Sequence, residues 1–310
     1  MIEKHKSVLL KEAISSLNLN ENSIVVDATL GYGGHSSNIL DRIKKGHLFA
    51  FDQDSEAIRH STDRLAKIGT NFTIIHSNFV HMREKLNELG IHDVDAVLFD
   101  LGVSSPQLDE GERGFSYHVD AKLDMRMDQS QELSAYDVVN QYSKEELAYI
   151  FKKYGEDKFA NNIAKKIVEK RMEKPIETTL ELVEVIKTAV PMKFRMDKHP
   201  ARQIFQAIRI EVNKELDVLE PALLQALDLI KVGGRVAVIT FHSLEDRIVK
   251  QLFKEKTDVD QAVKGMPNVP QEYLPDFKLV YSKVIVPSDE ELNDNPRARS
   301  SKLRVIEKIR

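Results

Sequence analysis

The chain has 310 residues, a length that suggests two domains at about 150 residues each. Its 45 basic and 49 acidic residues give a net charge of −4, and 42% of the residues are hydrophobic. This balance excludes a disordered or collagen-like chain, and any nucleic-acid-binding surface has to be local. The absence of cysteine excludes disulfides, Cys-ligated zinc, iron–sulfur clusters and thiolate catalysis.

The N-terminus has no apolar run long enough for a signal peptide, and no stretch of about 18 apolar residues follows. We therefore expect a cytoplasmic protein that does not associate with membranes. The His, Asp and Glu residues form no cluster with metal-ligand spacing, so no required metal is predicted.

Short apolar runs rich in β-branched and aromatic residues end in polar residues or glycine. They predict buried strands at 24–27, 48–52, 72–75, 94–100 and 236–241. Amphipathic segments of helix length separate most of them, and this alternation predicts a parallel sheet with helices on both faces. Two further candidate strands, 278–286 and 302–309, follow each other without a helix pattern and are candidates for an antiparallel edge pair.

One interval breaks this alternation. About 135 residues separate the strand ending at Asp100 from the strand beginning at Val236, far more than one crossover needs. A capping box of Ser143 and Glu146 opens the first of three helix patterns in this interval. The helix patterns are 144–154, 159–172 and 179–189.

These patterns predict a helical insert at 106–205 within one sheet domain, which is made of 1–105 and 206–310. The chain is expected to return to the sheet through a helix over 206–231. Gly233 or Gly234 suits the left-handed cap of such a helix.

The first strand leads into a glycine-rich turn, Asp27-Ala-Thr-Leu-Gly31-Tyr-Gly33-Gly34-His35-Ser36, that opens a helix. Glycines let the backbone approach a ligand closely, and a helix N-terminus offers free N–H groups to an anion. Asp52 ends the second strand 21 residues after Gly31, where an acid would meet ribose hydroxyls. Together they predict an adenosine-type ligand, the alternative being a structural turn with Asp52 capping the next helix.

Two classes of cofactor contain such an adenosine. The dinucleotide-binding pattern has a third glycine at a position that Ser36 occupies here, so the pattern is not matched. In addition, Asp27 suits an amino group better than a pyrophosphate. S-adenosylmethionine has an amino group, a carboxylate for the helix N-terminus and no phosphate, so it is favoured over the NAD of a dehydrogenase. Phe79, just beyond the third strand, is a candidate to cover adenine, or else a core residue.

Asp100 ends the fourth strand. In an open α/β sheet, ligands bind in the crevice outside the carboxyl ends of the strands. We therefore expect Asp100 to face the cofactor or its reaction partner, the alternative being a carboxylate that faces solvent.

Separate motifs, in order along nearly the whole chain, resemble the bacterial 16S ribosomal RNA cytosine-N4 methyltransferases (RsmH, formerly MraW). They are 27–36, 99–108 with 113–116, 202–209 through 213–216, 233–235 through 241–247, and 295–304. The resemblance implies a Rossmann-like S-adenosylmethionine-dependent methyltransferase sheet with an inserted helical domain that recognises RNA. It also implies N4-methylation of a decoding-centre (P-site) cytosine in the small ribosomal subunit. The cofactor residues carried over are Gly33, Gly34, His35, Asp52, Phe79, Asp100 and Gln107.

The exocyclic amine of cytosine is a poor nucleophile, so an enzyme must place it and accept hydrogen bonds from its hydrogens. Asp100 is the candidate catalytic acceptor, with a backbone carbonyl of 101–104 as the alternative. Asp100-Leu-Gly-Val departs from the Asp-Pro-Pro-aromatic motif of many amino-methyltransferases, and a role for Asp100 toward the cofactor alone stays open. Without cysteine, thiolate attack on the pyrimidine ring, the common route to carbon-5 methylation, is closed.

Local basic segments are candidates for RNA contacts. Residues 297–310 contain six basic residues and one acidic residue. The candidate RNA-binding side chains are Arg113, Phe115, His242, Arg297, Arg299, Lys302 and Arg304. For the basic residues of 297–310, the alternative is a solvated face on an edge strand. For Phe115 it is packing within the protein, and for His242 it is a structural role. A non-catalytic RNA-binding assembly factor is the second rival function, and the oligomeric state stays open, a homodimer included.

Overall fold

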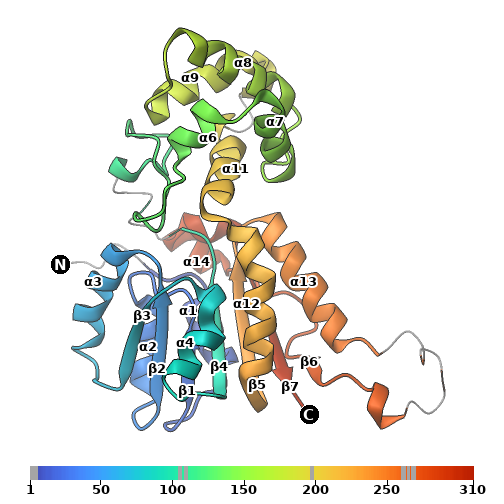
Figure 1. Ribbon diagram of the computed structural model, residues 1–310. Coiled ribbons are helices and arrows are strands. Elements are labelled where there is room, and N and C mark those ends of the chain that lie inside the picture. Colours follow the sequence, from blue (N-terminus) through green and yellow to red (C-terminus); the bar gives the residue numbers. More distant parts are fainter. Residues whose placement is uncertain are drawn as a thin grey trace. The chain divides into compact units, whose positions relative to one another are not determined.

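The protein is described by a computed structural model that covers residues 6–103, 107, 111–195, 199–259, 263, 266 and 270–310. The chain folds into two compact units, which are coloured along the sequence in Figure 1. The first unit combines Met1–Gly102 with Leu216–Arg310, and the second is Val103–Glu215. In the sequence, the second unit is therefore inserted into the first.

A seven-stranded sheet forms the centre of the first unit, in the order β3-β2-β1-β4-β5-β7-β6. The strands are β1 (Ile24–Asp27), β2 (His47–Asp52), β3 (Phe72–His76), β4 (Val94–Asp100), β5 (Ile230–Thr240), β6 (Phe277–Leu279) and β7 (Lys302–Lys308). Strands β1 to β5 pair in parallel, and β7 pairs antiparallel with both β5 and β6. This arrangement confirms the Rossmann-like sheet. It also places β7 inside the sheet, so only β6 of the expected pair is an edge strand.

The strand order reverses at β1, which lies between β2 and β4. From β1 the chain proceeds through β2 and β3 in one direction and then crosses to β4 on the other side. Such a switch point leaves a crevice at the carboxyl ends of the two central strands. Asp27 and Asp100 are the last residues of β1 and β4, so the topology brings two carboxyl groups from distant segments to this edge.

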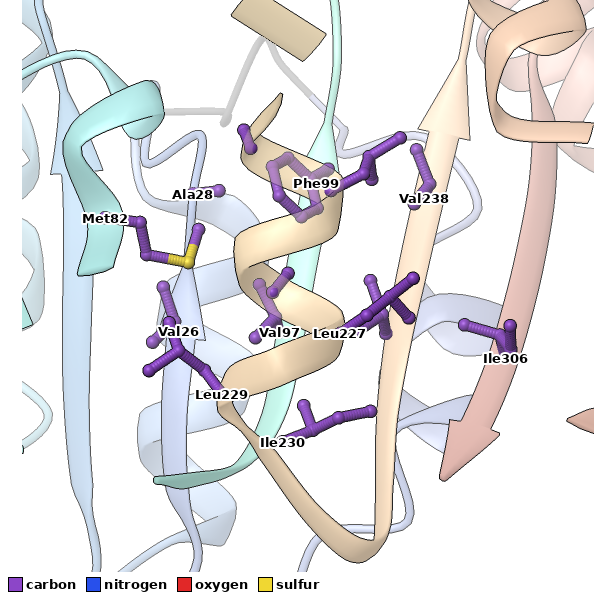
Figure 2. Close-up of a cluster of buried hydrophobic side chains, with 14 of the residues drawn as sticks. Val26, Ala28, Met82, Val97, Phe99, Leu227, Leu229, Ile230, Val238 and Ile306 are labelled. Carbon is purple, nitrogen blue, oxygen red and sulfur yellow. The ribbon is translucent and has the colours of Figure 1, made fainter. Parts of the chain in front are cut away.

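Helices cover both faces of the sheet because side chains of each strand alternate between two cores. On β4, Val97 and Phe99 belong to one core, with Ala96 and Leu98 in the other. Figure 2 shows the first core, which is closed by α4 (Met82–Glu88), α12 (Glu215–Leu229) and α13 (Ser243–Thr257). The second core is closed by α1 (Leu10–Ser16), α2 (Gly34–Arg42) and α3 (Ser55–Leu65). Shorter elements of this unit are η1 (Phe79–His81), η4 (Gln271–Tyr273), α14 (Asp289–Asp294) and η5 (Pro296–Ser300).

The second unit is helical in the part that the structure describes. Its elements are η2 (Gly111–Arg113), α6 (Ala135–Gln141), α7 (Lys144–Lys153), α8 (Ala160–Glu173), α9 (Thr179–Ala189), α10 (Met192–Arg195) and α11 (Ala201–Asn213). The capping box expected at the start of α7 is present, with Ser143 and Glu146 each bonded to the other's backbone N–H. Helix α11 packs against α6, α7 and α9, which is why this unit continues ten residues beyond the expected end of the insert.

Two local expectations for the return to the sheet are wrong. The segment expected as one helix from 206 to 231 consists of α11 and α12, separated by Lys214 in a left-handed conformation (φ 52°). Gly233 does adopt a left-handed conformation (φ 85°), but it lies within β5, after a helix that ends at Leu229. Strand β5 therefore begins six residues earlier than expected. The extra residues pair with β4 beyond a shift in register between Val94 and Ala96.

None of the described helices is both long and apolar enough to span a lipid bilayer.

The packing of α12 gives a direct test of the sheet core. Leu227 is 2% exposed and lies against the strands, whereas Leu224 on the same helix is 40% exposed. Leu227→Ala should lower the free energy of unfolding by about 2–5 kcal/mol, because it removes buried apolar contacts and leaves a cavity. Leu224→Ala is the matched control and should change it by less than about 0.5 kcal/mol. Urea denaturation followed by circular dichroism measures both, and equal losses would contradict this packing.

Candidate active site

The turn after β1 uses its glycines for two different purposes. Gly33 caps α2 with a left-handed backbone (φ 75°), which side-chain-bearing residues rarely adopt. Gly34 instead needs to be small, because a Cβ there would lie 1.9 Å from Ser7 Oγ of the N-terminal segment. The first N–H groups of α2 receive no side-chain cap, so they stay available at the start of the helix.

Asp27 is the buried centre of this turn. Its side chain is fully buried, its Oδ2 accepts a hydrogen bond from Ser36 Oγ (2.6 Å), and its Oδ1 accepts one from the Thr29 backbone N–H (3.1 Å). Burial raises the pKa of Asp27, and the Ser36 hydrogen bond opposes this rise. Both oxygens thus hold donors of the protein, so Asp27 braces the turn.

Asp52 ties the end of β2 to the same turn. Its Oδ2 accepts from the Gly31 backbone N–H (2.8 Å), and its Oδ1 accepts from the Asp54 backbone N–H (2.9 Å). Burial raises the pKa of Asp52 to about 6, although both backbone hydrogen bonds oppose the rise. Each carboxylate oxygen keeps a second lone pair, so this half-buried group can still accept hydrogen bonds from hydroxyls of a ligand.

Asp100 is held at the end of β4 from two sides. Its backbone N–H donates to Thr29 Oγ1 (2.6 Å), and its Oδ2 lies 3.2 Å from His35 Nδ1. Its Oδ1 is buried and accepts no hydrogen bond from the described residues. A buried carboxylate oxygen without a donor is costly, so this atom marks a place where a ligand N–H or O–H would bind.

His35 links Asp100 to the N-terminal segment. The imidazole is 5% exposed, and its Nε2 lies 3.1 Å from the carbonyl oxygen of Val8. Burial alone would lower the pKa of His35, but the Asp100 carboxylate, with Asp27 adding to it, raises this pKa above its usual value.

Phe79 begins η1, directly beyond β3. Its half-buried ring meets Phe99 of β4 edge to face, with the ring centroids 5.6 Å apart. The first unit thus gathers six of the seven expected cofactor residues at its carboxyl edge: Gly33, Gly34, His35, Asp52, Phe79 and Asp100. The seventh, Gln107, is a buried residue of the second unit.

Comparison with known proteins decides the family. The sequence model of the MraW methylase family matches residues 2–309. A protein of Exiguobacterium sibiricum named "Ribosomal RNA small subunit methyltransferase H" is 54% identical over 308 residues, which cover 99% of each chain. The chain belongs to the MraW methylase family.

Solved structures are similar at a lower level. A crystal structure of an rRNA methylase from Streptococcus thermophilus matches with 14% identity and a TM-score of 0.43, over 97% of this chain and 93% of that one. A methyltransferase homologue from Pyrococcus horikoshii matches with 13% identity and a TM-score of 0.46, over 98% of this chain and 67% of that one. Family membership rests on the sequence matches.

Two of the basic residues considered for RNA binding are paired within the methylase. Lys302 Nζ and Arg304 Nε on β7 each donate to the Asp246 carboxylate on α13, at 2.8 Å. Arg297 and Arg299 lie exposed on η5. The pairing with Asp246 therefore reduces the basic character of β7.

His242 caps α13. Its Nδ1 accepts from the Glu245 backbone N–H (3.4 Å), and the Glu245 carboxylate accepts in return from the backbone N–H groups of Phe241 (2.8 Å) and His242 (3.3 Å). The side chain is 9% exposed. This geometry matches the structural alternative for His242 and offers no exposed imidazole for RNA.

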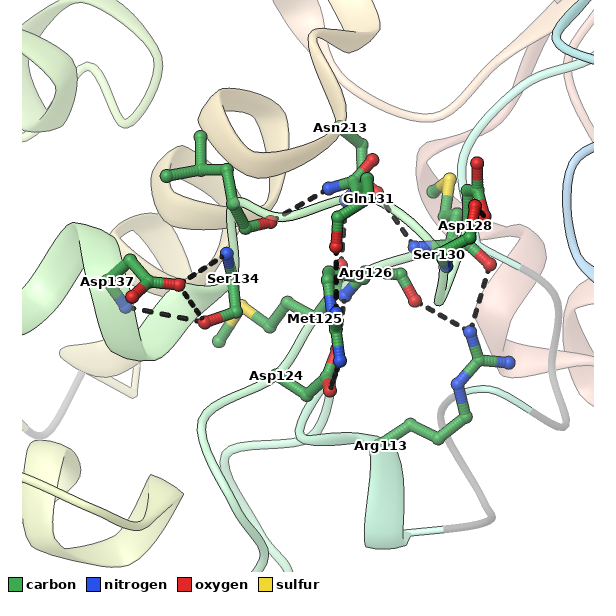
Figure 3. A network of polar contacts seen from close by, with 12 residues as sticks. Arg113, Asp124, Met125, Arg126, Asp128, Ser130, Gln131, Ser134, Asp137 and Asn213 are labelled. Carbon is green, nitrogen blue, oxygen red and sulfur yellow. Dashed lines mark hydrogen bonds and ion pairs between the residues drawn. The ribbon is translucent and has the colours of Figure 1, made fainter.

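Arg113 is part of the loop network of the second unit that Figure 3 shows. Its Nη2 donates to the carbonyl oxygens of Arg126 (2.6 Å) and Met127 (3.1 Å), and Asn213 of α11 accepts from the Met127 N–H (2.8 Å). Phe115 is 6% exposed, with the Arg113 guanidinium 5.7 Å from its ring centroid. Arg113 thus holds a loop that Asn213 ties to α11, and the buried Phe115 presents little surface to a base.

Sequence reasoning missed three polar partners that organise the site: Thr29, Ser36 and Asp246. Ser36 was used only as the position where a dinucleotide glycine is missing, although a hydroxyl nine residues after a buried acid is itself a signal. Asp246 lies in the 241–247 segment that carries the resemblance, but its pairing with β7 depends on the antiparallel strand arrangement.

The Asp27 brace can be tested by removing its hydroxyl donor. Ser36→Ala should lower the free energy of unfolding by about 1–3 kcal/mol, because a buried carboxylate loses a hydrogen bond that nothing replaces. Asn38→Ala, on the exposed side of α2, is the control, with an expected change within about 0.5 kcal/mol. Thermal and urea unfolding measure the stability of both variants against the unmodified protein. A neutral effect of Ser36→Ala would show that Asp27 does not brace the turn.

Proposed function

We propose that this methylase transfers a methyl group from S-adenosylmethionine to the N4 amine of a decoding-centre (P-site) cytosine of 16S ribosomal RNA in the small subunit. The observation that carries the proposal is the 54% identity, over 99% of both chains, to a protein named as a small-subunit ribosomal RNA methyltransferase. The site at the switch point supplies the chemistry. We place the activity in the cytoplasm, with the small ribosomal subunit as partner.

The carboxyl edge fits the proposed cofactor. Asp52 keeps lone pairs for ribose hydroxyls, and Phe79 presents a half-buried ring beyond β3. The N–H groups at the start of α2 suit a carboxylate. The unpartnered Oδ1 of Asp100 suits an N–H donor, and no phosphate is needed to explain any of these groups. A nicotinamide dinucleotide is less suitable, because β1, β2 and β4 each end in an aspartate, and carboxylates repel a pyrophosphate.

S-adenosylmethionine supplies a methyl group on a positively charged sulfur when it is bound. The chain's own task is to bind the cation and to orient the nitrogen that attacks it. Asp100 Oδ1 is the acceptor available to hold an N–H group, whether of the cofactor or of the cytosine amine. Because the chain has no cysteine, a thiolate route to carbon 5 is absent, and transfer to the exocyclic nitrogen fits the residues present.

RNA recognition is proposed for basic and aromatic surfaces of both units. In the first unit, Arg297 and Arg299 lie exposed on η5, where they can neutralise phosphates. In the second unit, Tyr117 stacks on His199, with the ring centroids 4.7 Å apart. Burial lowers the pKa of His199, and nearby His118 and Lys187 add to this effect. A neutral imidazole stacked on a tyrosine beside basic residues suits contact with unpaired bases.

Methyl transfer tests the proposed function directly. Small subunits from a strain that lacks the protein should accept labelled methyl groups from S-adenosylmethionine when the full chain is added. Asp52→Ala should weaken cofactor binding and reduce transfer at limiting cofactor, because hydroxyl acceptors are lost. No transfer under conditions where a control enzyme works would favour the RNA-binding assembly factor. Calorimetry that finds NAD binding without S-adenosylmethionine binding would favour the dehydrogenase.

The raised pKa of Asp52 gives a pH prediction. Below pH about 6 the carboxyl is protonated and a poorer acceptor, so S-adenosylmethionine should bind more tightly as pH rises through this value. If only the ionised form binds, affinity at pH 5 should be about tenfold weaker than at pH 7. Calorimetric titration between pH 5 and 7.5 measures this. Asp52→Asn should flatten the profile, and exposed Asp41→Asn should keep it. If Asp52→Asn left the pH profile unchanged, a group other than Asp52 would cause the pH dependence of cofactor binding.

A further inference from the structure

We propose that His35 is a positioning residue whose imidazole is protonated at neutral pH and fixes the Asp100 carboxylate, so that only the carboxylate's Oδ1 meets the ligand. The inference rests on the proposed function of the carboxyl edge and gives His35 a role different from cofactor contact. Its ring is 5% exposed and both ring nitrogens lie against protein oxygens, so the imidazole itself is not a surface for the cofactor.

The protonation state follows from the two neighbours of the ring. Nε2 lies 3.1 Å from the Val8 carbonyl oxygen, and Nδ1 lies 3.2 Å from Asp100 Oδ2. A carbonyl and a carboxylate oxygen only accept hydrogen bonds, whereas a neutral imidazole has a single N–H. A neutral ring would therefore point a bare nitrogen lone pair at an oxygen in a buried place. The imidazolium satisfies both neighbours.

The charges around the ring favour the same state. Asp100 and Asp27 are the carboxyl groups that act on His35, and both favour the charged form of the ring. Among the described residues, no Lys or Arg forms an ion pair with either carboxylate. His35 is thus the cation that offsets part of the negative charge at the ends of β1 and β4.

The consequence for Asp100 is a fixed orientation. Thr29 Oγ1 holds its backbone N–H, and His35 holds Oδ2, so rotation of the carboxyl group would break a charge-assisted hydrogen bond. Oδ1 is left buried, without a donor among the described residues. The ring also joins three segments, because Val8 precedes α1, His35 belongs to the first turn of α2, and Asp100 ends β4. The position of Oδ1 therefore depends on the N-terminal segment as well as on the sheet.

Nuclear magnetic resonance of the imidazole nitrogens tests the protonation state without cofactor or RNA. In the full chain, the His35 signals are assigned by their absence from His35→Gln, with exposed His92→Gln as the control for assignment. At pH 7 both nitrogens should carry protons, and the ring should lose one only at a pH above the usual histidine range. Asp100→Asn should lower that titration point. A neutral ring with an unprotonated Nδ1 at pH 7 would overturn the proposal.

A double-mutant cycle tests the positioning role. His35→Gln and Asp100→Asn should each impair the same quantity, either the cofactor dissociation constant or kcat, by up to about a hundredfold. The double variant should lose no more than the worse single variant, because both changes release the same carboxylate. Losses that multiply would show independent roles and contradict the proposal. Unfolding midpoints of each variant identify a loss that comes from misfolding, and the protonation state itself is read from the spectrum of the unmodified chain.

The pH profile separates positioning from simple packing. Wild-type cofactor affinity and kcat/KM should fall as pH rises through the His35 titration point, since the neutral ring no longer holds Oδ2. His35→Gln should lack this alkaline fall, and His92→Gln should retain it. An alkaline fall that persists in His35→Gln would overturn the assignment. If the wild type neither binds S-adenosylmethionine nor transfers methyl groups, the proposed function fails, whereas the nitrogen spectra still decide the charge of His35.

Discussion

The hydrogen bonds of the buried Asp27 carboxylate organise the whole carboxyl edge of the sheet. Asp27 holds Ser36 of α2 and the backbone of Thr29, and Thr29 in turn accepts the backbone N–H of Asp100. In the same turn, the Gly31 backbone N–H donates a hydrogen bond to the Asp52 carboxylate. One buried acid thus connects the ends of β1, β2 and β4 to the first turn of α2. A fully buried carboxylate is unfavourable unless its partners stay in place, so this centre makes the edge rigid.

The electrostatics of the edge follow from that arrangement. Three carboxyl groups, Asp27, Asp52 and Asp100, lie at the ends of neighbouring strands, and His35 provides positive charge beside two of them. A site of this kind favours a cation and an N–H donor over a pyrophosphate. Without a cysteine to attack a pyrimidine ring, its means of promoting methylation are placement and hydrogen bonding to a nitrogen. We therefore regard transfer to an exocyclic amine as the central claim.

Much of this fold is readable from the sequence, because β1 and β4 have bounds identical to the apolar runs at 24–27 and 94–100. The start of β5 was missed, since a glycine pair typical of a helix cap lies inside a strand with shifted register. The role of Asp27 was also missed, because it depends on which atoms Ser36 reaches after folding. Lys302 and Arg304 suggested RNA contacts, but their pairing with Asp246, more than 50 residues away in sequence, requires the folded sheet.

The most direct test of the central claim is mass-spectrometric mapping of 16S ribosomal RNA from a strain lacking the protein, before and after its gene is restored. The account predicts that restoration returns one methyl group to a single decoding-centre cytosine, and that fragmentation places it on the exocyclic nitrogen. A methyl group on carbon 5, a modification confined to large-subunit RNA, or identical RNA in both strains would contradict the account.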